Sequence, residues 1–342
     1  MHPHAEQDRD RLRRERKVHF GPFVAGDLVN LHPLQPRRQK TAGTLEEMQY
    51  GLSTHVFLQQ RLHTELLGAM HRAGAEAIEI FAARHHFDYT DRSAIRDVAA
   101  WFRDTGTLAT LHQPLYADAQ WSRHVAPNLD LIDREKSRRI EAMDEVKRAL
   151  ESAEQIPFRS VVLHLGMKGD TWSSRSLENS LSAIEHVKAF AGPLGVRILL
   201  ENLPNEVTSP ERLLEILEVG RFDSVGVCLD IGHAHLTDYQ NPGAGIDAAF
   251  DLLKSRIAEF HLHDNNGGRD EHLWPGAAAT GIDWQNIYRH TSALDPNIPG
   301  ILEIAYDLNE IPGTVQQKAQ AFFDSQRRME DQQNAGGSPE QG

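Results

Sequence analysis

The chain has 342 residues, 40% of them hydrophobic, and a formal net charge of −13 at pH 7. This composition is typical of a globular protein with a large core, and no apolar run approaches the roughly 20 residues that would cross a bilayer. The acidic balance disfavours binding to a polyanion such as DNA. The single cysteine, Cys228, excludes an internal disulfide, so we expect a cytoplasmic protein that does not associate with membranes.

Residues 1–47 differ from the rest of the chain. A charge run (RDRLRRERK, residues 9–17) and a proline-containing stretch (LHPLQPRRQK, residues 31–40) have neither helical nor strand periodicity, so we expect a disordered extension. A basic nucleic-acid-binding arm is the alternative interpretation. Met48 stands directly before the first predicted strand and is a candidate translation start. The polar tail at residues 325–342 is also expected to be disordered.

Short apolar runs alternate with segments of helical periodicity between residues 48 and 324. Eight runs are predicted to be strands: 50–57, 75–81, 108–112, 160–165, 196–202, 224–231, 257–263 and 300–305. The clearest helical segments are 131–154, 177–191, 210–219, 244–254 and 315–328. Eight strands that alternate with helices predict one (β/α)8 TIM barrel of the α/β class. A doubly wound sheet is disfavoured because no G-x-G-x-x-G motif follows the first strand.

Ionisable side chains stand where six of the eight predicted strands end, and active sites of barrels form at the carboxyl ends of the strands. These residues are His112, His164, Glu201, Asp230, His261 and Glu303. Burying such groups without a cation would cost several kcal/mol each. Imidazole and carboxylate ligands together suit a divalent ion such as Zn, Mn or Co. The sequence therefore predicts a divalent-metal site at this rim. His85 and His86, after the second strand, are further candidates for the rim of the pocket.

Two segments carry a resemblance to a known family. CLDIGHAHL (residues 228–236) resembles the sixth-strand Asp-x-x-His element of the xylose-isomerase-like TIM barrel superfamily. HLHDNNGGRDEHLWPG (residues 261–276) resembles its seventh-strand histidine, followed by a loop Asp-x-His. The superfamily includes sugar (phosphate) isomerases and epimerases as well as endonuclease IV type apurinic endonucleases. The resemblance covers roughly residues 50–324.

The resemblance implies two alternative ligand sets. The endonuclease IV type has nine ligands for up to three metals, which correspond here to His112, His164, Glu201, Asp230, His233, His261, Asp270, His272 and Glu303. The epimerase type has four ligands, which correspond to Glu201, Asp230, His261 or His263, and Glu303. The loop between His261 and Asp270 is shorter than in the endonuclease pattern, which argues against binding of the third metal. The expected cofactor is one to three divalent ions.

The preferred functional hypothesis is a sugar or sugar phosphate isomerase or epimerase that transfers a proton through an enediolate. Glu201 and Glu303 would exchange the proton, and His233 would bind the metal or a substrate oxygen. His263, Asn202 and Trp121 are the predicted substrate-binding residues. The expected partner is a small sugar or polyol, and the oligomeric state is left open.

The alternative hypothesis is a metal-dependent phosphodiesterase that acts at abasic DNA sites. It needs all nine ligands, which are present, and also basic and aromatic loops that grip a bent duplex. The loop after the second strand (residues 82–93) is short and of mixed charge, and the chain is acidic. A dehydratase or a barrel that only binds its ligand are further alternatives.

Overall fold

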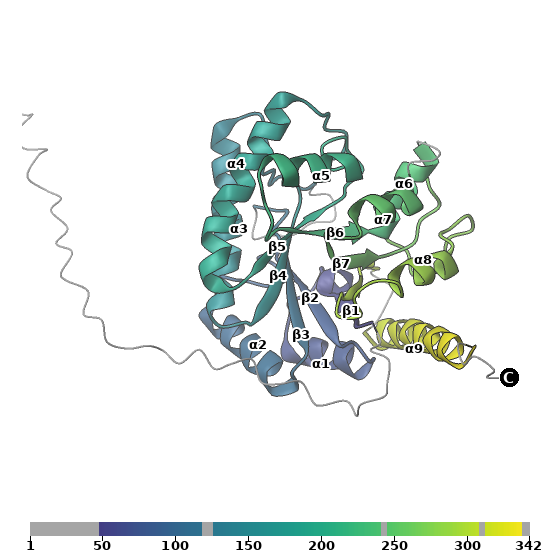
Figure 1. Cartoon of the computed structure of the whole chain (residues 1–342). Coiled ribbons are helices and arrows are strands. Elements are labelled where there is room, and N and C mark those ends of the chain that lie inside the picture. Colours follow the sequence, from purple (N-terminus) through teal and green to yellow (C-terminus); the bar gives the residue numbers. More distant parts are fainter. Residues whose placement is uncertain (1–47, 118–125, 241–244, 308–311, 337–342) are drawn as a thin grey trace, which may run out of the picture. The chain divides into compact units, whose positions relative to one another are not determined.

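The computed structural model describes residues 48–117, 126–240, 245–307 and 312–336. The predicted extension at residues 1–47 lies outside these ranges. Within them, strands and helices alternate along the chain, and Figure 1 shows the helices arranged around the strands.

The strands are parallel and close into a barrel in which each pairs with the next and β8 pairs with β1. Their bounds are β1 Tyr50–Ser53, β2 Ala77–Phe81, β3 Leu108–His112, β4 Phe158–Leu163, β5 Arg197–Glu201, β6 Gly226–Asp230, β7 Ile257–Leu262 and β8 Gly300–Leu302. The predicted (β/α)8 barrel is therefore confirmed, and β3 has the predicted bounds.

Helices connect the strands and cover them on the outside. The α-helices are α1 Thr64–Arg72, α2 Arg92–Thr105, α3 Lys136–Leu150, α4 Ser174–Ala191, α5 Pro210–Val219, α6 Ile231–Gln240, α7 Ile246–Leu253, α8 Trp284–Thr291 and α9 Pro312–Gly336. Short 3₁₀ helices are η1 Thr54–Phe57, η2 Glu151–Glu154 and η3 Gly192–Leu194. No helix among the described residues has both the length and the apolar character that crossing a bilayer requires.

Most elements begin or end at other residues than the sequence predicted, including β1, α6 and α9. The first strand ends at Ser53 instead of Phe57, because the Ser53 side chain accepts a hydrogen bond from the His55 amide and η1 begins there. Helix α6 starts directly after β6, ahead of the helix predicted at residue 244. Helix α9 continues to Gly336, so residues 325–336 are helical where we expected a disordered tail; their glutamine, glutamate and arginine residues are good helix formers.

The strands are covered by side chains on both faces, so polar residues inside the barrel are conspicuous. Ile78, Leu111 and Leu200 are fully buried and belong to a single large apolar cluster. Glu201 and Asp230 are buried to the same extent at the carboxyl ends of their strands. The closed sheet thus carries charged groups into a region from which water is excluded.

Close strand packing requires glycine at position 51. A Cβ atom there would lie 2.4 Å from the Ala77 carbonyl oxygen and 2.6 Å from Ile301 Cδ1. We predict that Gly51→Ala lowers the free energy of unfolding by about 1–3 kcal/mol, because the backbone of β2 must shift. Urea denaturation measures this change.

Gly313 provides the matched control, because it is exposed in the first turn of α9 and a Cβ atom there would meet nothing within 4 Å. Gly313→Ala should leave stability unchanged or raise it by about 0.4–1 kcal/mol. Equal stability of the two variants would contradict the packing argument.

Candidate metal centre

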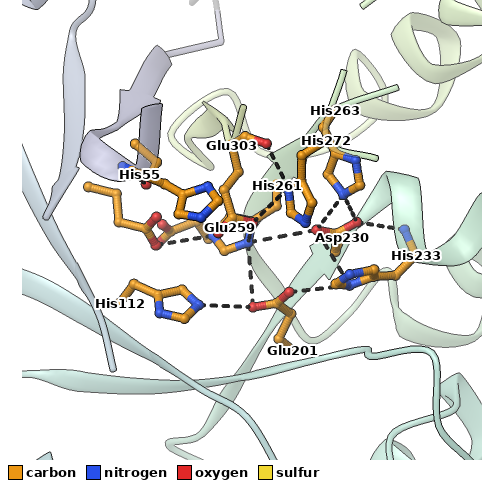
Figure 2. A network of polar contacts seen from close by, with 12 residues as sticks. His55, His112, Glu201, Asp230, His233, Glu259, His261, His263, His272 and Glu303 are labelled. Atoms are coloured by element: carbon orange, nitrogen blue, oxygen red, sulfur yellow. Dashed lines mark hydrogen bonds and ion pairs between the residues drawn. The ribbon is translucent and has the colours of Figure 1, made fainter. Parts of the chain in front are cut away.

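The carboxyl ends of six consecutive strands bring the predicted ligands together. His112, Glu201 and Asp230 are the last residues of β3, β5 and β6. His261 lies near the end of β7, while His164 and Glu303 directly follow β4 and β8. Figure 2 shows His112, Glu201, Asp230, His261 and Glu303 converging on one region. The six predicted strand-end residues therefore meet at one rim.

Asp230 is held in place by the backbone around it. Its Oδ1 accepts a hydrogen bond from the His233 amide at 2.7 Å, which caps the first turn of α6. Its own amide donates to Asn202 Oδ1 at 2.7 Å, and its carbonyl accepts from Asn202 Nδ2 at 2.9 Å. The helix therefore begins directly after β6, and the Asp230 carboxylate is fixed at the rim.

These contacts give Asn202 a structural role, whereas the sequence analysis predicted a contact with substrate. Both ends of its amide are bonded to the Asp230 backbone, and its side chain is buried. Asn202 does not line the cavity over the rim. Its contacts join the ends of β5 and β6, so they do not support a contact with substrate.

The first group of ligand atoms comprises His112, His164 and Glu201. Nε2 of His164 lies 2.9 Å from Glu201 Oε2 and 3.0 Å from Nε2 of His112, and Nε2 of His112 lies 3.7 Å from Glu201 Oε2. Zinc bonds of about 2.0–2.1 Å at tetrahedral angles would separate ligand atoms by about 3.3 Å. The observed separations bracket this value, so the group fits a divalent ion.

The second group comprises Glu201, Asp230, His261 and Glu303, all buried. His261 Nδ1 lies 3.1 Å from Glu303 Oε2, 3.5 Å from Glu201 Oε2 and 3.9 Å from Asp230 Oδ2. Among the described residues, this nitrogen has no hydrogen-bond partner. A buried ring nitrogen that faces three carboxylates without a hydrogen bond fits a cation between them. Glu201 belongs to both groups and could bridge two ions.

The third group comprises His233, Asp270 and His272 from α6 and the loop after β7, with His263 close by. Asp270 Oδ2 lies 3.1 Å from His233 Nε2, and its Oδ1 lies 3.2 Å from His272 Nε2. The shortened loop after β7 therefore still brings Asp270 and His272 to the rim. All nine residues of the larger predicted ligand set lie in these three groups.

His263 has a different environment from the one predicted. Its ring stacks on that of His272, with centroids 3.8 Å apart and planes inclined by 16°. Its Nε2 lies 3.0 Å from Asp230 Oδ1, and the side chain is fully buried outside the cavity lining. His263 therefore supports Asp230, and the predicted contact with substrate is not supported.

A backbone carbonyl fixes the orientation of three of the histidine rings. The Nδ1 atoms of His112, His233 and His272 lie 2.9, 2.9 and 2.8 Å from the carbonyl oxygens of Gln113, Asn202 and Glu303, respectively. A carbonyl only accepts, so each Nδ1 carries a proton, and in the neutral ring each Nε2 presents a lone pair to the rim. Such a bond to the second ring nitrogen is typical of metal-binding histidines.

The charged groups of the centre shift one another's pKa. Burial by itself would raise the pKa of Glu201, but His164 and His261 outweigh it and hold this pKa well below its usual range. Burial opposes charge on His272, yet Asp270 and Glu303 raise its pKa to about 10. Without a cation, protonated rings thus balance the carboxylates, and a divalent ion would displace these protons.

His55 is a rim residue that the sequence analysis missed. It lies in η1, and its ring is 5.6 Å from that of His272 and 4.9 Å from that of Phe81. Its Nδ1 donates to the Ile304 carbonyl, and a ligand atom of its ring lies within 4.8 Å of ligand atoms of His272 and Glu303. The predicted first strand, residues 50–57, included this residue. Had the strand been predicted to end at Ser53, His55 would have been recognised as a histidine that follows a strand end.

A cavity of about 200 Å³ lies over the rim. Its lining includes the ionisable residues His55, His164, Glu201, His233, Asp270, His272 and Glu303. The rest of the lining is mostly apolar and includes Phe81, Leu115, Tyr116, Leu129, Met167 and Leu203. Lys168 is the one lysine or arginine among the described residues that line it. Trp121, a predicted substrate contact, lies outside the described residues.

Comparisons with known proteins agree with this geometry. The model of the family described as xylose isomerase-like TIM barrel matches residues 67–326. The chain belongs to this family. An uncharacterised protein of Methanocaldococcus jannaschii is 34% identical over 135 residues, which cover 37% of this chain and 45% of that protein. A Haloquadratum walsbyi protein named "Probable endonuclease 4" is 25% identical over 229 residues, which cover 63% and 73%.

The chain spans about half the length of three of its curated relatives. Solved structures match more completely. A D-tagatose 3-epimerase-like protein has a TM-score of 0.64 at 23% identity, covering 84% of this chain and 99% of that one. The IolI protein with a bound zinc atom has a TM-score of 0.65 at 18% identity, covering 82% and 98%. At these identities, the likeness establishes the barrel fold.

In this xylose isomerase-like barrel, substitution of Asp230 tests the metal centre most directly. Asp230→Asn keeps the cap of α6, because asparagine is as good an N-cap as aspartate, but it removes the charge. We predict that affinity for Zn²⁺ falls by more than the 10–100-fold typical of changes to groups that support a ligand. Competition with a chromophoric chelator measures this affinity, and elemental analysis measures the metal content.

Asp247→Asn is the control, because Asp247 is exposed and binds Asn286 and His290 on the outside of the barrel. It should retain the metal content of the parent chain. Full metal content in Asp230→Asn would remove this residue from the proposed ligands.

His85 and His86 do not reach the cavity of this barrel. Nε2 of His85 lies 3.0 Å from the Leu58 carbonyl, and Nδ1 of His86 lies 2.6 Å from the Gln60 carbonyl. Burial lowers the pKa of each ring to about 4. Their role at the pocket rim, which the sequence suggested, is therefore not supported, and their neutral rings hold the segment after β2.

His86 should make stability depend on pH. Its pKa is about 4 in the folded chain against an ordinary value of 6.5, so the unfolded chain takes up the proton first. Its contribution to stability is complete above pH 6.5 and is lost as the pH falls toward 4. We predict that His86→Asn, which keeps a donor for Gln60, flattens the dependence of the unfolding free energy on pH within this window. Urea denaturation at a series of pH values measures the slope.

His186→Asn, at an exposed position of α4, should keep the slope of the parent chain. Identical slopes in both variants would show that the buried ring at position 86 does not control the acid response.

Proposed function

We propose that the chain is a metal-dependent isomerase or epimerase of a sugar or sugar phosphate, acting by proton transfer through an enediolate. The observation that carries this proposal is the position of Glu201 and Glu303. Both line the cavity, they come from β5 and β8, and both approach His261 Nδ1, at 3.5 and 3.1 Å. Two ionised carboxylates thus flank one cation position at the floor of the cavity.

This arrangement suits removal and return of a proton at a carbon next to a carbonyl. One glutamate would take the proton from the substrate carbon, and the other would give a proton back, either to the opposite face of that carbon or to its neighbour. His233, whose Nε2 faces the rim, would hold the metal or a substrate oxygen. A divalent ion supplies positive charge opposite the oxygen that becomes negative in this step.

Several of the similar structures support a sugar substrate for this proposal. They include a D-psicose 3-epimerase with D-tagatose from Clostridium cellulolyticum and an L-ribulose 3-epimerase. The apolar wall of the cavity suits a face of carbon-bound hydrogens, and Lys168 at its edge is available to a phosphate. The IolI structure favours zinc among the candidate ions Zn, Mn and Co.

A phosphodiesterase acting at abasic DNA is the second candidate function. The three groups of ligands, which contain the complete nine-residue set, and the relative named for endonuclease 4 favour it. The net charge of −13 and the presence of only one lysine or arginine among the described cavity-lining residues oppose it, because a DNA backbone requires several cationic contacts.

Deuterium exchange separates the two functions. Metal-loaded protein in D₂O should introduce solvent deuterium at the carbon next to the carbonyl of a ketohexose or its phosphate. Glu303→Gln should reduce this exchange by about 10²–10⁴-fold, because a general acid–base group contributes that much. Nuclear magnetic resonance of the recovered sugars measures the exchange.

The matched control is Glu185→Gln on the exposed face of α4, which should exchange at the rate of the parent chain. Cleavage of an abasic duplex by the zinc-loaded protein, without exchange into any ketose tested, would favour the phosphodiesterase instead.

A further inference from the structure

Two more glutamates lie inside the barrel beneath the metal centre. Glu79 on β2 and Glu259 on β7 are fully buried, and neither belongs to the ligand sets described above. Glu259 and His261 stand two residues apart on β7 and therefore face the same side of the strand. Figure 2 shows Glu259 close to the ligand cluster. Buried carboxylates need partners, and these two have different ones.

The partners of Glu259 are hydroxyl groups. Thr110 Oγ1 donates to one carboxylate oxygen at 3.1 Å, and Ser160 Oγ donates to the other at 2.9 Å. Both oxygens are therefore bonded to neutral groups from β3 and β4. Glu259 needs no contact with a metal ligand to satisfy its hydrogen-bonding capacity.

Glu79 instead contacts the ring of His261. Its Oε2 lies 3.1 Å from His261 Nε2, and both side chains are fully buried. Its Oε1 has no hydrogen-bond partner among the described residues. The Oε2 atom of Glu79 accepts, so His261 Nε2 carries a proton, and when an ion displaces a second ring proton, Nδ1 presents its lone pair toward Glu201, Asp230 and Glu303.

His261 thus differs from the other oriented rings of the centre. Backbone carbonyls fix His112, His233 and His272 through Nδ1, whereas a charged side chain fixes His261 through Nε2. A carboxylate holds a ring proton more strongly than a carbonyl does and makes the opposite nitrogen a better donor to a metal.

We infer that Glu79 is a positioning residue for the metal centre: it sets the tautomer and orientation of His261 and strengthens its Nδ1 as a ligand. The inference rests on the proposed metal centre and extends it to a residue on β2. A positive ion bound at Nδ1 would in turn stabilise the negative charge of Glu79 through the ring. The charge of Glu79 therefore strengthens binding of the ion at Nδ1, and the bound ion stabilises that charge.

Paired variants test this inference. Glu79→Gln keeps the shape and an acceptor oxygen but removes the charge, and Glu259→Gln makes the same change in the neighbouring carboxylate. We expect Glu79→Gln to bind Zn²⁺ about 10–100-fold more weakly than the parent chain, as is typical of such supporting groups. Glu259→Gln should bind it with nearly unchanged affinity. Chelator competition on the full chain measures affinity, and circular dichroism of the metal-free proteins checks the fold.

A second measurement needs no variant. In the zinc-loaded parent chain labelled with ¹⁵N-histidine, His261 should show a protonated Nε2 and a metal-bound Nδ1, with the ring assigned by comparison with His261→Asn. A metal-bound or unprotonated Nε2 would overturn the inference even if Glu79→Gln failed to fold.

The outcomes separate this inference from the proposed centre. A parent chain that binds no divalent ion would overturn both. A parent chain that binds Zn²⁺, with equal affinity in Glu79→Gln, would overturn only the role of Glu79. Loss of one ion per chain in both glutamine variants would instead identify Glu79, Glu259 and His261 as an ion site of their own, and would also overturn the positioning role.

Discussion

The free-energy cost of burying negative charge determines which groups can lie together at the carboxyl ends of the barrel strands. Glu201, Asp230 and Glu303 are at most 4% exposed and stand within reach of one ring nitrogen. Carboxylates in a region without water need opposite charge and hydrogen bonds, or they take up protons. Here, the ring of His261 approaches all three, and nearby histidines outweigh the effect of burial and hold the pKa values of Glu201 and Glu303 well below their usual range. The rim is consequently a set of charges that a divalent ion completes.

The barrel supplies the rigidity that this arrangement needs. Asp230 is at once the end of β6, the cap of α6 and a predicted ligand, and Asn202 ties it to β5. Three rings are fixed by backbone carbonyls, so the hydrogen bonds of the chain itself set the direction of their lone pairs. Ligands held in this manner lose little freedom when an ion binds, which favours affinity.

The sequence predicted those features of the site that depend on strand ends and buried charge. Carboxylates within valine and leucine runs, such as Glu201 and Asp230, are conspicuous in the sequence because such runs are buried. The sequence did not show the contacts of groups whose partners come from another strand or a distant loop. Asn202 bonds to backbone atoms of another strand, and His263 stacks on a ring that a loop brings back. His55 was missed because a serine cap ends β1 four residues earlier than its apolar pattern predicts.

The number of bound ions is linked to the charge of the substrate. The nine ligands include four carboxylates, those of Glu201, Asp230, Asp270 and Glu303. Three divalent ions would leave the centre with two positive charges, which suits a phosphodiester, while two ions would leave it neutral and one would leave it two negative charges, which suits an uncharged sugar. The same residues can therefore serve either chemistry, and the cavity wall decides between them. In this chain, the lining other than the ligand residues is mostly apolar with one lysine among its described residues, which favours a sugar over a DNA backbone.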